Sequence, residues 1–222
     1  MPVCIKRLIP ASLYGAFYLT CFSWLERHTR HYHIISSSLD EYIPFCEYFI
    51  VPYLLWFFYI AIGGLFFVFF NDDSIEYWRL YINLTFGMTL FLLISYLYPN
   101  GLRLRPDSFP RNNIFTDMVK ALYQTDTSTN VLPSIHVYNS LAIFFAINDC
   151  KKLQPHKILR KSAAILTLLI ILSTMFLKQH SVLDVVLGIV ISYSAYLLIY
   201  HAPVQFPAKH TAVKRKKREK SL

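Results

Sequence analysis

Long apolar segments are the feature that most constrains how this chain folds. Six stretches are apolar over close to, or more than, the roughly 20 residues that a helix needs to cross a bilayer. They lie at about 7–25, 44–70, 76–98, 133–149, 161–177 and 182–202. Of the 222 residues, 55% are hydrophobic and 16% are charged. We therefore predict an all-α bundle of six transmembrane helices that forms one domain over residues 1–222.

The first two segments each allow two interpretations. The first could be a signal peptide or an anchor. No small-residue cleavage site follows it at Trp24–Arg27, which favours an uncleaved span. The second segment contains Pro44 and Pro52, so we expect it to begin in the membrane interface or to be kinked.

Lysine and arginine residues in the loops predict the orientation of the bundle. Cytoplasmic loops carry an excess of these residues, and one side would hold Lys6, Arg7, the loop at about 150–161 and a basic tail at about 209–222. Both termini are therefore expected in the cytoplasm. The tail and that loop supply most of the net charge of +9. We interpret them as a topology signal in preference to a site for anionic lipid headgroups, and we expect no nucleic-acid partner.

Neither the cysteines nor the histidine-rich stretch at 27–33 predicts a metal site. The cysteines are scattered without a CxxC pair, at Cys4, Cys21, Cys46 and Cys150, and we expect all of them to be free. Histidine-rich segments can bind metal, but this one has no acid at helical spacing and its arginines would repel a cation. An interfacial loop is favoured, and we expect neither a metal nor a cofactor.

Two histidines lie where an apolar segment meets a short polar one. They are His136, in Pro133-Ser134-Ile135-His136, and His180, which Asp184 follows four residues later. Residues four apart lie on one face of a helix, and a carboxylate in an apolar span is costly unless it is paired. We therefore expect Asp184 to pair with His180. Two imidazoles, one of them backed by an acid, are suited to nucleophilic and acid–base chemistry near neutral pH.

Alternating spans bring the third and fifth loops to the same extracytoplasmic side. The third loop, about 99–132, begins with Arg103-Leu104-Arg105-Pro106, and the fifth is Lys178–Ser181. One interface would then hold Arg105, Ser134, His136, Lys178, His180 and Asp184. Such a set suits a phosphoryl group, whose oxygens need fixed cations and hydrogen-bond donors. Pro133 is expected in the first turn of the fourth span, with free backbone N–H groups behind it that could hold an anion.

These residues resemble the type 2 phosphatidic acid phosphatase superfamily of lipid phosphatases. Its pattern is K-x6-RP, then PSxH, then SR-x5-H-x3-D. The second motif is intact at 133–136, and the third is present as Ser173, His180 and Asp184 at the same spacing. Two cations of the pattern are missing, because Tyr98 stands at the lysine of the first motif and Thr174 at the arginine of the third.

The sequence offers substitutes for these two cations. Lys178 lies four residues after Thr174, on the same face if the helix continues, and its long stem could reach the same space. We expect Lys178 to replace the arginine, and Arg103, two residues before Arg105, is a candidate for the other missing cation. Ser173 either contacts phosphate or bonds to its own helix backbone.

The resemblance implies a role for each residue. His180 would be the nucleophile that forms a phosphohistidine, Asp184 would orient it, and His136 would serve as general acid and then as general base. The phosphoryl oxygens would be bound by Arg105, Ser134 and Lys178, with Arg103 and Ser173 as further candidates.

The resemblance further implies a metal-independent membrane lipid phosphatase. Its substrate would be a lipid phosphate monoester or diphosphate, such as phosphatidic acid, phosphatidylglycerol phosphate or a polyprenyl diphosphate. Two alternatives stay open. The Ser-Ile-His and Lys-Gln-His segments are similar to those of inositol phosphorylceramide synthases, which transfer a phosphoryl headgroup to a lipid alcohol. A lipid-phosphate binding or transport protein could also keep this scaffold. The small size favours a bacterial cell membrane, and the oligomeric state is not predicted.

Overall fold

The computed structural model describes residues 2–29 and 31–201, so the basic tail predicted at 209–222 lies outside the described residues. The helices are α1 Val3–His28, α2 Ile50–Leu65, α3 Ser74–Leu97, α4 Ile114–Thr125, α5 Ile135–Asp149, α6 Lys157–Phe176 and α7 Val182–Tyr196. Short 3-10 turns lie at Ser38–Glu41, Glu47–Phe49 and Lys151–Leu153, and π-helical turns extend α2 over Phe66–Phe70 and α7 over Leu197–His201. Two short strands, β1 His33–Ile34 and β2 Asn100–Gly101, pair in parallel.

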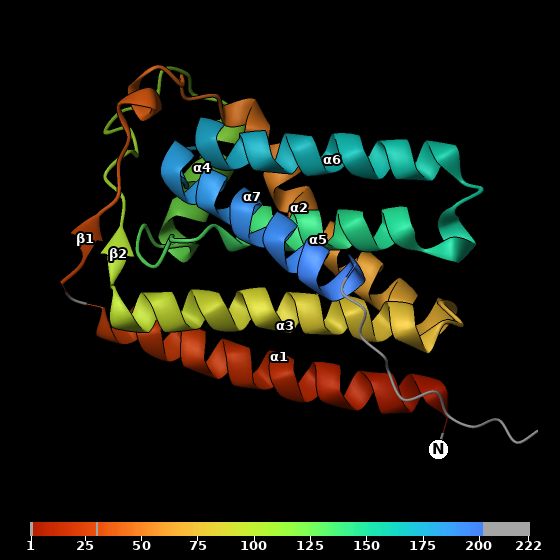
Figure 1. Ribbon diagram of the computed structural model, residues 1–222. Helices are drawn as coiled ribbons and strands as arrows, with labels where there is room; N and C mark the ends of the chain where they lie inside the picture. The colour runs from red at the N-terminus through yellow and green to blue at the C-terminus, as the bar shows by residue number, and fades with distance from the viewer. Residues whose placement is uncertain (1, 30, 202–222) are drawn as a thin grey trace, which may run out of the picture.

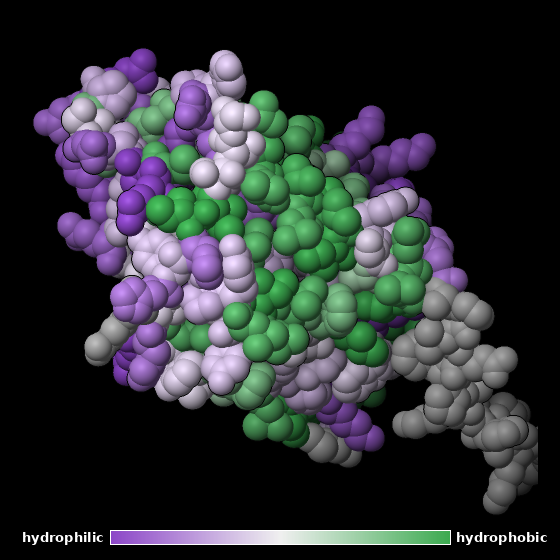
Figure 2. All heavy atoms as spheres, turned by 60° about the vertical axis from the view of Figure 1, so that its left-hand side comes forward, coloured by the Kyte–Doolittle hydropathy of each residue, from purple (hydrophilic) through white to green (hydrophobic). Residues whose placement is uncertain are grey.

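Five helical segments are long and apolar enough to cross a membrane. They are Val3–His28, Glu47–Phe70, Ser74–Leu97, Lys157–Phe176 and Val182–His201. Helices α1, α3 and α6 run nearly parallel, and α2 and α7 cross the bundle obliquely between its two ends (Figure 1). Hydrophobic residues gather in a band between two more hydrophilic ends (Figure 2). The prediction of an all-α, polytopic membrane fold is thereby confirmed.

The sixth predicted span, 133–149, is α5, and it differs from the others. It has 15 residues, so it is only about 22 Å long at 1.5 Å per residue, which is shorter than the roughly 30 Å hydrocarbon core. Its neighbours are α2, α3, α6 and α7. Because α5 is surrounded by protein, it buries polar side chains such as Asn139 and Ser140 together with Val137 and Ile143. Its short length and buried polar side chains fit this central position.

Side-chain caps account for several helix starts. The Asp73 carboxylate accepts the N–H of Ile75 at 2.8 Å at the start of α3, and the Asn113 side chain accepts the N–H of Thr116 at 2.9 Å at the start of α4. Helix α4 lies within the stretch that the sequence analysis treated as a loop. Pro52 lies in the first turn of α2, where a missing N–H costs no hydrogen bond, and this position explains how the helix accommodates it.

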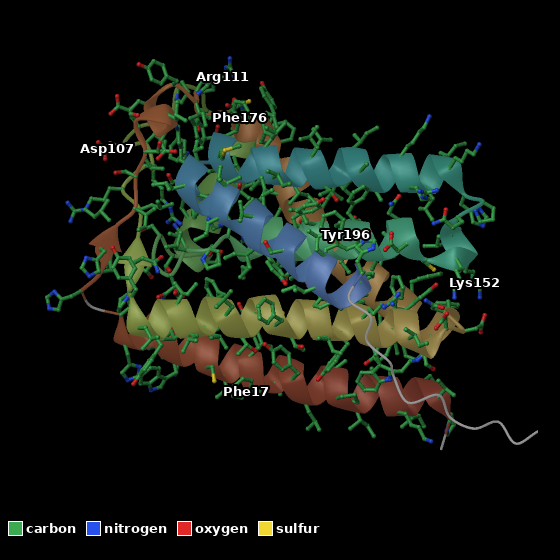
Figure 3. The ribbon with its side chains drawn as sticks, in the orientation of Figure 1. Phe17, Asp107, Arg111, Lys152, Phe176 and Tyr196 are labelled. Atoms are coloured by element: carbon green, nitrogen blue, oxygen red, sulfur yellow. The ribbon has the colours of Figure 1, made fainter. Side chains whose placement is uncertain are left out.

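The connections gather at two opposite ends of the bundle (Figure 1). One end holds the segments 31–49, 98–134 and 177–181, and Figure 3 shows Asp107 and Arg111 there and Lys152 at the other. At this second end, Arg7 is buried and its Nη1 donates to the carbonyl oxygens of Phe67 (3.0 Å) and Asn71 (2.5 Å). Arg7 therefore ties α1 to the π-helical turn after α2, in addition to contributing positive charge to this end.

A glycine on α3 sets how closely α3 and α5 approach. The Tyr138 hydroxyl donates to Asn83 Oδ1 at 2.6 Å, and a Cβ atom added at Gly87 would lie 2.0 Å from Cε1 of the Tyr138 ring. Gly87→Ala is therefore expected to destabilise the protein by about 1–3 kcal/mol, the usual cost of overpacking. The measurement is the melting temperature in detergent. Gly15→Ala is the control, because its added Cβ would meet nothing within 4 Å; equal melting temperatures for the two variants would contradict this packing.

Candidate active site

The segment 133–136 starts α5. Ser134 is the N-cap, and its hydroxyl accepts the Val137 N–H at 3.4 Å. Pro133 precedes the cap, so the prediction that it lies in the first helical turn was wrong. Ser134 is fully buried, and its hydroxyl donates no hydrogen bond to any described residue. His136 follows in the first turn of α5, which points its side chain toward the loop end of the bundle.

The loop 177–181 positions His180 between α6 and α7. The backbone N–H groups of Gln179 and His180 both donate to the carbonyl oxygen of Thr174, at 2.9 and 3.0 Å, and thereby close the C-terminus of α6. The next residue, Ser181, caps α7 and donates from its hydroxyl to Asp40 Oδ2 at 2.6 Å. The loop is therefore held from both sides.

The structure brings His136, His180 and Asp184 into one hydrogen-bonded chain. Asp184 Oδ2 lies 2.6 Å from His180 Nδ1, and His180 Nε2 lies 3.3 Å from His136 Nδ1. All three residues are buried: 8% of the surface of His136 is exposed, 6% of that of His180 and 0% of that of Asp184. A carboxylate on Nδ1 favours the tautomer of His180 that has its proton on Nδ1 and a free electron pair on Nε2.

The first turns of α5 and α7 are joined directly. The Ser134 N–H donates to the backbone carbonyl of Asp184 at 3.2 Å. Close contact is possible because residue 188 is glycine: a Cβ at Gly188 would lie 3.1 Å from the Ser134 carbonyl oxygen. The ring of His136 packs on the other side against Tyr53 and Trp56, with centroid separations of 4.8 and 4.4 Å. His136 is thus held by packing as well as by its hydrogen bond to His180.

Arg105 is connected to the histidine pair through Gln179, the residue before His180. Its Nε and Nη2 atoms donate to Gln179 Oε1 at 3.1 and 2.7 Å, and Nη1 and Nη2 donate to the carbonyl oxygens of Tyr123 (3.0 Å) and Asp126 (2.5 Å). The guanidinium also lies over the Tyr123 ring, 4.4 Å from its centroid. Burial lowers the pKa of Arg105, but an arginine stays protonated in proteins. A fixed cation therefore sits beside Gln179, the neighbour of His180.

The structure does not bring Lys178 to the histidines. Its Nζ donates to the carbonyl oxygens of Asp40 (2.7 Å) and Ile43 (2.5 Å), and burial lowers its pKa. The prediction assumed that α6 continues past Thr174 for another turn. Helix α6 instead ends at Phe176, and Lys178 has a left-handed backbone with φ 55°. Its side chain is therefore directed at the segment 40–43, and the expected substitution for the missing arginine is not supported.

Two further candidates also lie outside this cluster. Ser173 is fully buried, and its hydroxyl donates to the Ile170 carbonyl at 2.6 Å. Ser173 therefore bonds to its own helix backbone, which is one of the two roles predicted for it, and no hydrogen bond joins it to the histidines. Arg103 is exposed, and no hydrogen bond joins its side chain to a described residue. Of the predicted phosphate ligands, Arg105 and Ser134 are thus the two that lie next to the histidines or their supporting residues.

Sequence reasoning missed three residues of this network. Gln179 Nε2 donates to Asp126 Oδ2 at 3.3 Å, and the Tyr53 hydroxyl donates to the same oxygen at 2.6 Å. Asp126 lies in the predicted third loop, outside the motifs. Gln179 could have been suspected because it precedes His180, but no periodicity links position 53 or 126 to the motifs.

A narrow cavity of about 30 Å³ opens onto the two histidines. Its polar wall includes Gln179 and Asp126, and its lining as a whole is Phe22, Phe91, Asp126, Thr127, Thr129, Asn130, Val131, Ile135, His136, Gln179 and His180. No group of three or more metal-binding side chains was found within residues 2–29 and 31–201. In the histidine-rich stretch, His28 stacks on Trp24 and His33 on Tyr98, with ring centroids 4.5 and 4.4 Å apart.

Comparisons with known proteins agree with the motifs. No curated protein and no solved structure matches the chain. A family model described as the PAP2 superfamily matches residues 77–208, which is more than half of the chain. The matched range includes Arg105, His136, His180 and Asp184. The chain therefore belongs to the PAP2 superfamily, in agreement with the resemblance of its motifs to the type 2 phosphatidic acid phosphatases.

Proposed function

We propose that this protein hydrolyses a phosphate ester of a membrane lipid through a phosphohistidine on His180. Membership of the PAP2 superfamily supports a phosphatase or phosphotransferase activity in general, and the apolar helices support an integral membrane protein. The observation that carries the proposal is the buried chain Asp184–His180–His136, in which the carboxylate contacts Nδ1 of His180 and the second histidine lies next to its Nε2.

In the first step, the electron pair on His180 Nε2 attacks phosphorus. A P–N bond forms while the ester P–O bond breaks, and a protonated His136 gives its proton to the departing alcohol oxygen. Asp184 stabilises the positive charge that develops on the His180 ring. The substrate would replace the present contact between His136 Nδ1 and His180 Nε2, since both residues line the same cavity.

In the second step, His136 takes a proton from water. The hydroxide attacks the phosphohistidine, the P–N bond breaks, and inorganic phosphate leaves with His180 restored. Transfer to a lipid alcohol would use the same residues, with an alcohol in place of water. Product analysis therefore distinguishes hydrolysis from transfer.

The oxygens of the phosphoryl group need donors in both steps. The planar guanidinium of Arg105 can donate to two of these oxygens at once. The Ser134 hydroxyl, which donates to no described residue, can donate to a third. Arg105 must first release Gln179, whose Oε1 now occupies two of its N–H groups. We propose that phosphate and the Gln179 side chain compete for this arginine.

Positive residues at the end of the bundle opposite the histidines support an active site on the extracytoplasmic face. That end holds Arg7, Lys151, Lys152, Lys157 and Arg160, and positive residues favour the cytoplasmic side. A bacterial cell membrane, with both termini in the cytoplasm, is the setting that we propose. The substrate's acyl chains would remain in the bilayer while the phosphate reaches the interface.

The test uses purified full-length protein in detergent micelles with phosphatidic acid, phosphatidylglycerol phosphate and a polyprenyl diphosphate, each with chelator present. We expect phosphate release from at least one of them, because the proposed nucleophile and acid are both histidines. Diacylglycerol added as an acceptor tests transfer. No release and no transfer with any substrate would support the alternative of a lipid-phosphate binding protein.

Replacing Gln179 by glutamate tests the competition for Arg105. A carboxylate at this position would form an ion pair with Arg105 and add a negative charge beside the phosphate, so kcat/KM is expected to fall by roughly 10- to 100-fold, the size of a lost charge-assisted contact. Gln124→Glu on the exposed face of α4 is the matched control. A Gln179→Glu enzyme that keeps the activity of the control would show that Arg105 does not bind phosphate.

A further inference from the structure

Asp126 lines the active-site cavity, and one of its carboxylate oxygens has no hydrogen-bond donor among the described residues. Its Oδ2 accepts from Tyr53 (2.6 Å) and Gln179 (3.3 Å), whereas no described residue donates to Oδ1. Asp126 lines the same cavity as His136 and His180, and no other Asp or Glu belongs to that lining. An acceptor without a donor, on a residue that shares a cavity with both histidines, is suited to a donor supplied by the substrate.

The cavity adjoins a second and larger one at Asp126. The second cavity has a volume of about 280 Å³ and is lined by Phe22, Ser23, Glu26, Arg27, Thr125, Asp126 and Thr127. The two linings share Phe22, Asp126 and Thr127. Asp126 therefore lies where a group attached to the phosphate would pass from one cavity into the other.

The charges around this passage favour a neutral group over a second phosphate. Glu26 and Asp126 are carboxylates, and Arg27 is the one arginine or lysine in either lining. Glu26 is already satisfied, because Asn130 Nδ2 donates to its Oε1 at 2.6 Å and the Thr127 hydroxyl donates to its Oε2. A second phosphate here would be repelled by Asp126 at short range, whereas a hydroxyl would donate a charge-assisted hydrogen bond to it.

We infer that Asp126 is a specificity-determining residue that accepts a hydrogen bond from a free hydroxyl on the alcohol part of the substrate. The substrate class is a phosphate monoester of a glycerol-like unit with a free hydroxyl next to the ester carbon. Lipid diphosphates would be poor substrates. This inference rests on the proposed function and narrows its substrate class.

The experiment compares two substrates that differ in one hydroxyl. They are lysophosphatidic acid and its 2-deoxy analogue, with the same acyl chain, assayed with the full-length protein in micelles. We expect wild-type kcat/KM to be roughly 10-fold or more higher for the hydroxylated substrate, in keeping with a hydrogen bond to a charged group. Polyprenyl diphosphate serves as the third substrate.

Asp126→Asn is the variant of choice because it preserves the volume of the side chain. Its amide oxygen would be retained by Tyr53 and Gln179, so the NH₂ group would face the cavity and offer no acceptor. The ratio of kcat/KM between the two matched substrates should therefore fall to within about 2-fold of one, while relative activity on the diphosphate rises. Asp117→Asn on α4, whose side chain is 65% exposed and paired with Lys120, should keep the wild-type ratio.

The ratio separates specificity from a structural effect, because damage to the site lowers activity on both substrates together. A wild-type ratio near one, or an unchanged ratio in Asp126→Asn, would overturn this inference and leave the proposed function intact. Absence of phosphate release from every substrate by the wild-type protein would instead overturn the proposed function, and the inference with it.

Discussion

Replacing His180 by alanine is expected to lower kcat/KM by at least about 10⁴-fold, as removal of a nucleophile does in enzymes that act through covalent intermediates. The physical reason is that Nε2 of His180 is the one atom of the buried chain that combines a free electron pair with support from a carboxylate. No other described side chain stands in this position. Phosphate release from the preferred lipid is the measurement.

The control for this prediction is His156→Ala, an exposed histidine at the opposite end of the bundle. Both variants should elute as the wild-type protein does in size-exclusion chromatography. A His180→Ala enzyme that retains more than about one hundredth of wild-type kcat/KM would show that His180 is not the nucleophile.

Replacing Asp184 by asparagine is expected to lower kcat by about 10²- to 10⁴-fold with little change in KM, as the loss of a tautomer-fixing carboxylate does. An asparagine oxygen can still accept the Nδ1 proton, but its amide N–H can also donate to Nδ1 and so hold the His180 ring in the wrong tautomer. The neutral amide also gives no charge to stabilise the imidazolium that forms during attack.

Asp149→Asn is the matched control for Asp184→Asn. Asp149 ends α5 at the other end of the bundle, and its carboxylate accepts from the Tyr196 hydroxyl at 3.1 and 3.2 Å. A kcat for Asp184→Asn within about 3-fold of this control would contradict the role of Asp184 as the residue that orients His180.

The sequence predicts the spanning helices well and the connections poorly. Long apolar runs are sufficient for five spans, because the bilayer dictates their length. The sequence underestimates how different α5 is, since a helix surrounded by protein does not need the length of a lipid-facing one. Helix α4 was missed because its 12 residues lie among loop residues and pack only one face, through Val119 and Leu122, against the bundle.

In the candidate site, too, contacts between neighbours in sequence could be predicted and contacts between distant segments could not. His180 and Asp184 are four residues apart on one chain segment, and local spacing alone brings them together. The prediction for Lys178 was wrong because it assumed a continuous helix. Helix α6 ends at Phe176, and the left-handed backbone of Lys178 turns the chain in a new direction two residues later. The bonds of Arg105 to Gln179 and of Asp126 to Tyr53 join segments 74 and 73 positions apart, and only the folded structure brings these residues into contact.

The most direct test of the central claim is to trap the phosphoryl enzyme. Wild-type protein is mixed with a lipid phosphate labelled in its phosphoryl group, quenched within the first turnover and digested for peptide mapping. We expect a label that is stable in alkali, lost in acid and located on the peptide that contains His180. A label on another residue, or rapid turnover with no labelled protein at any time, would contradict catalysis through a phosphohistidine at His180.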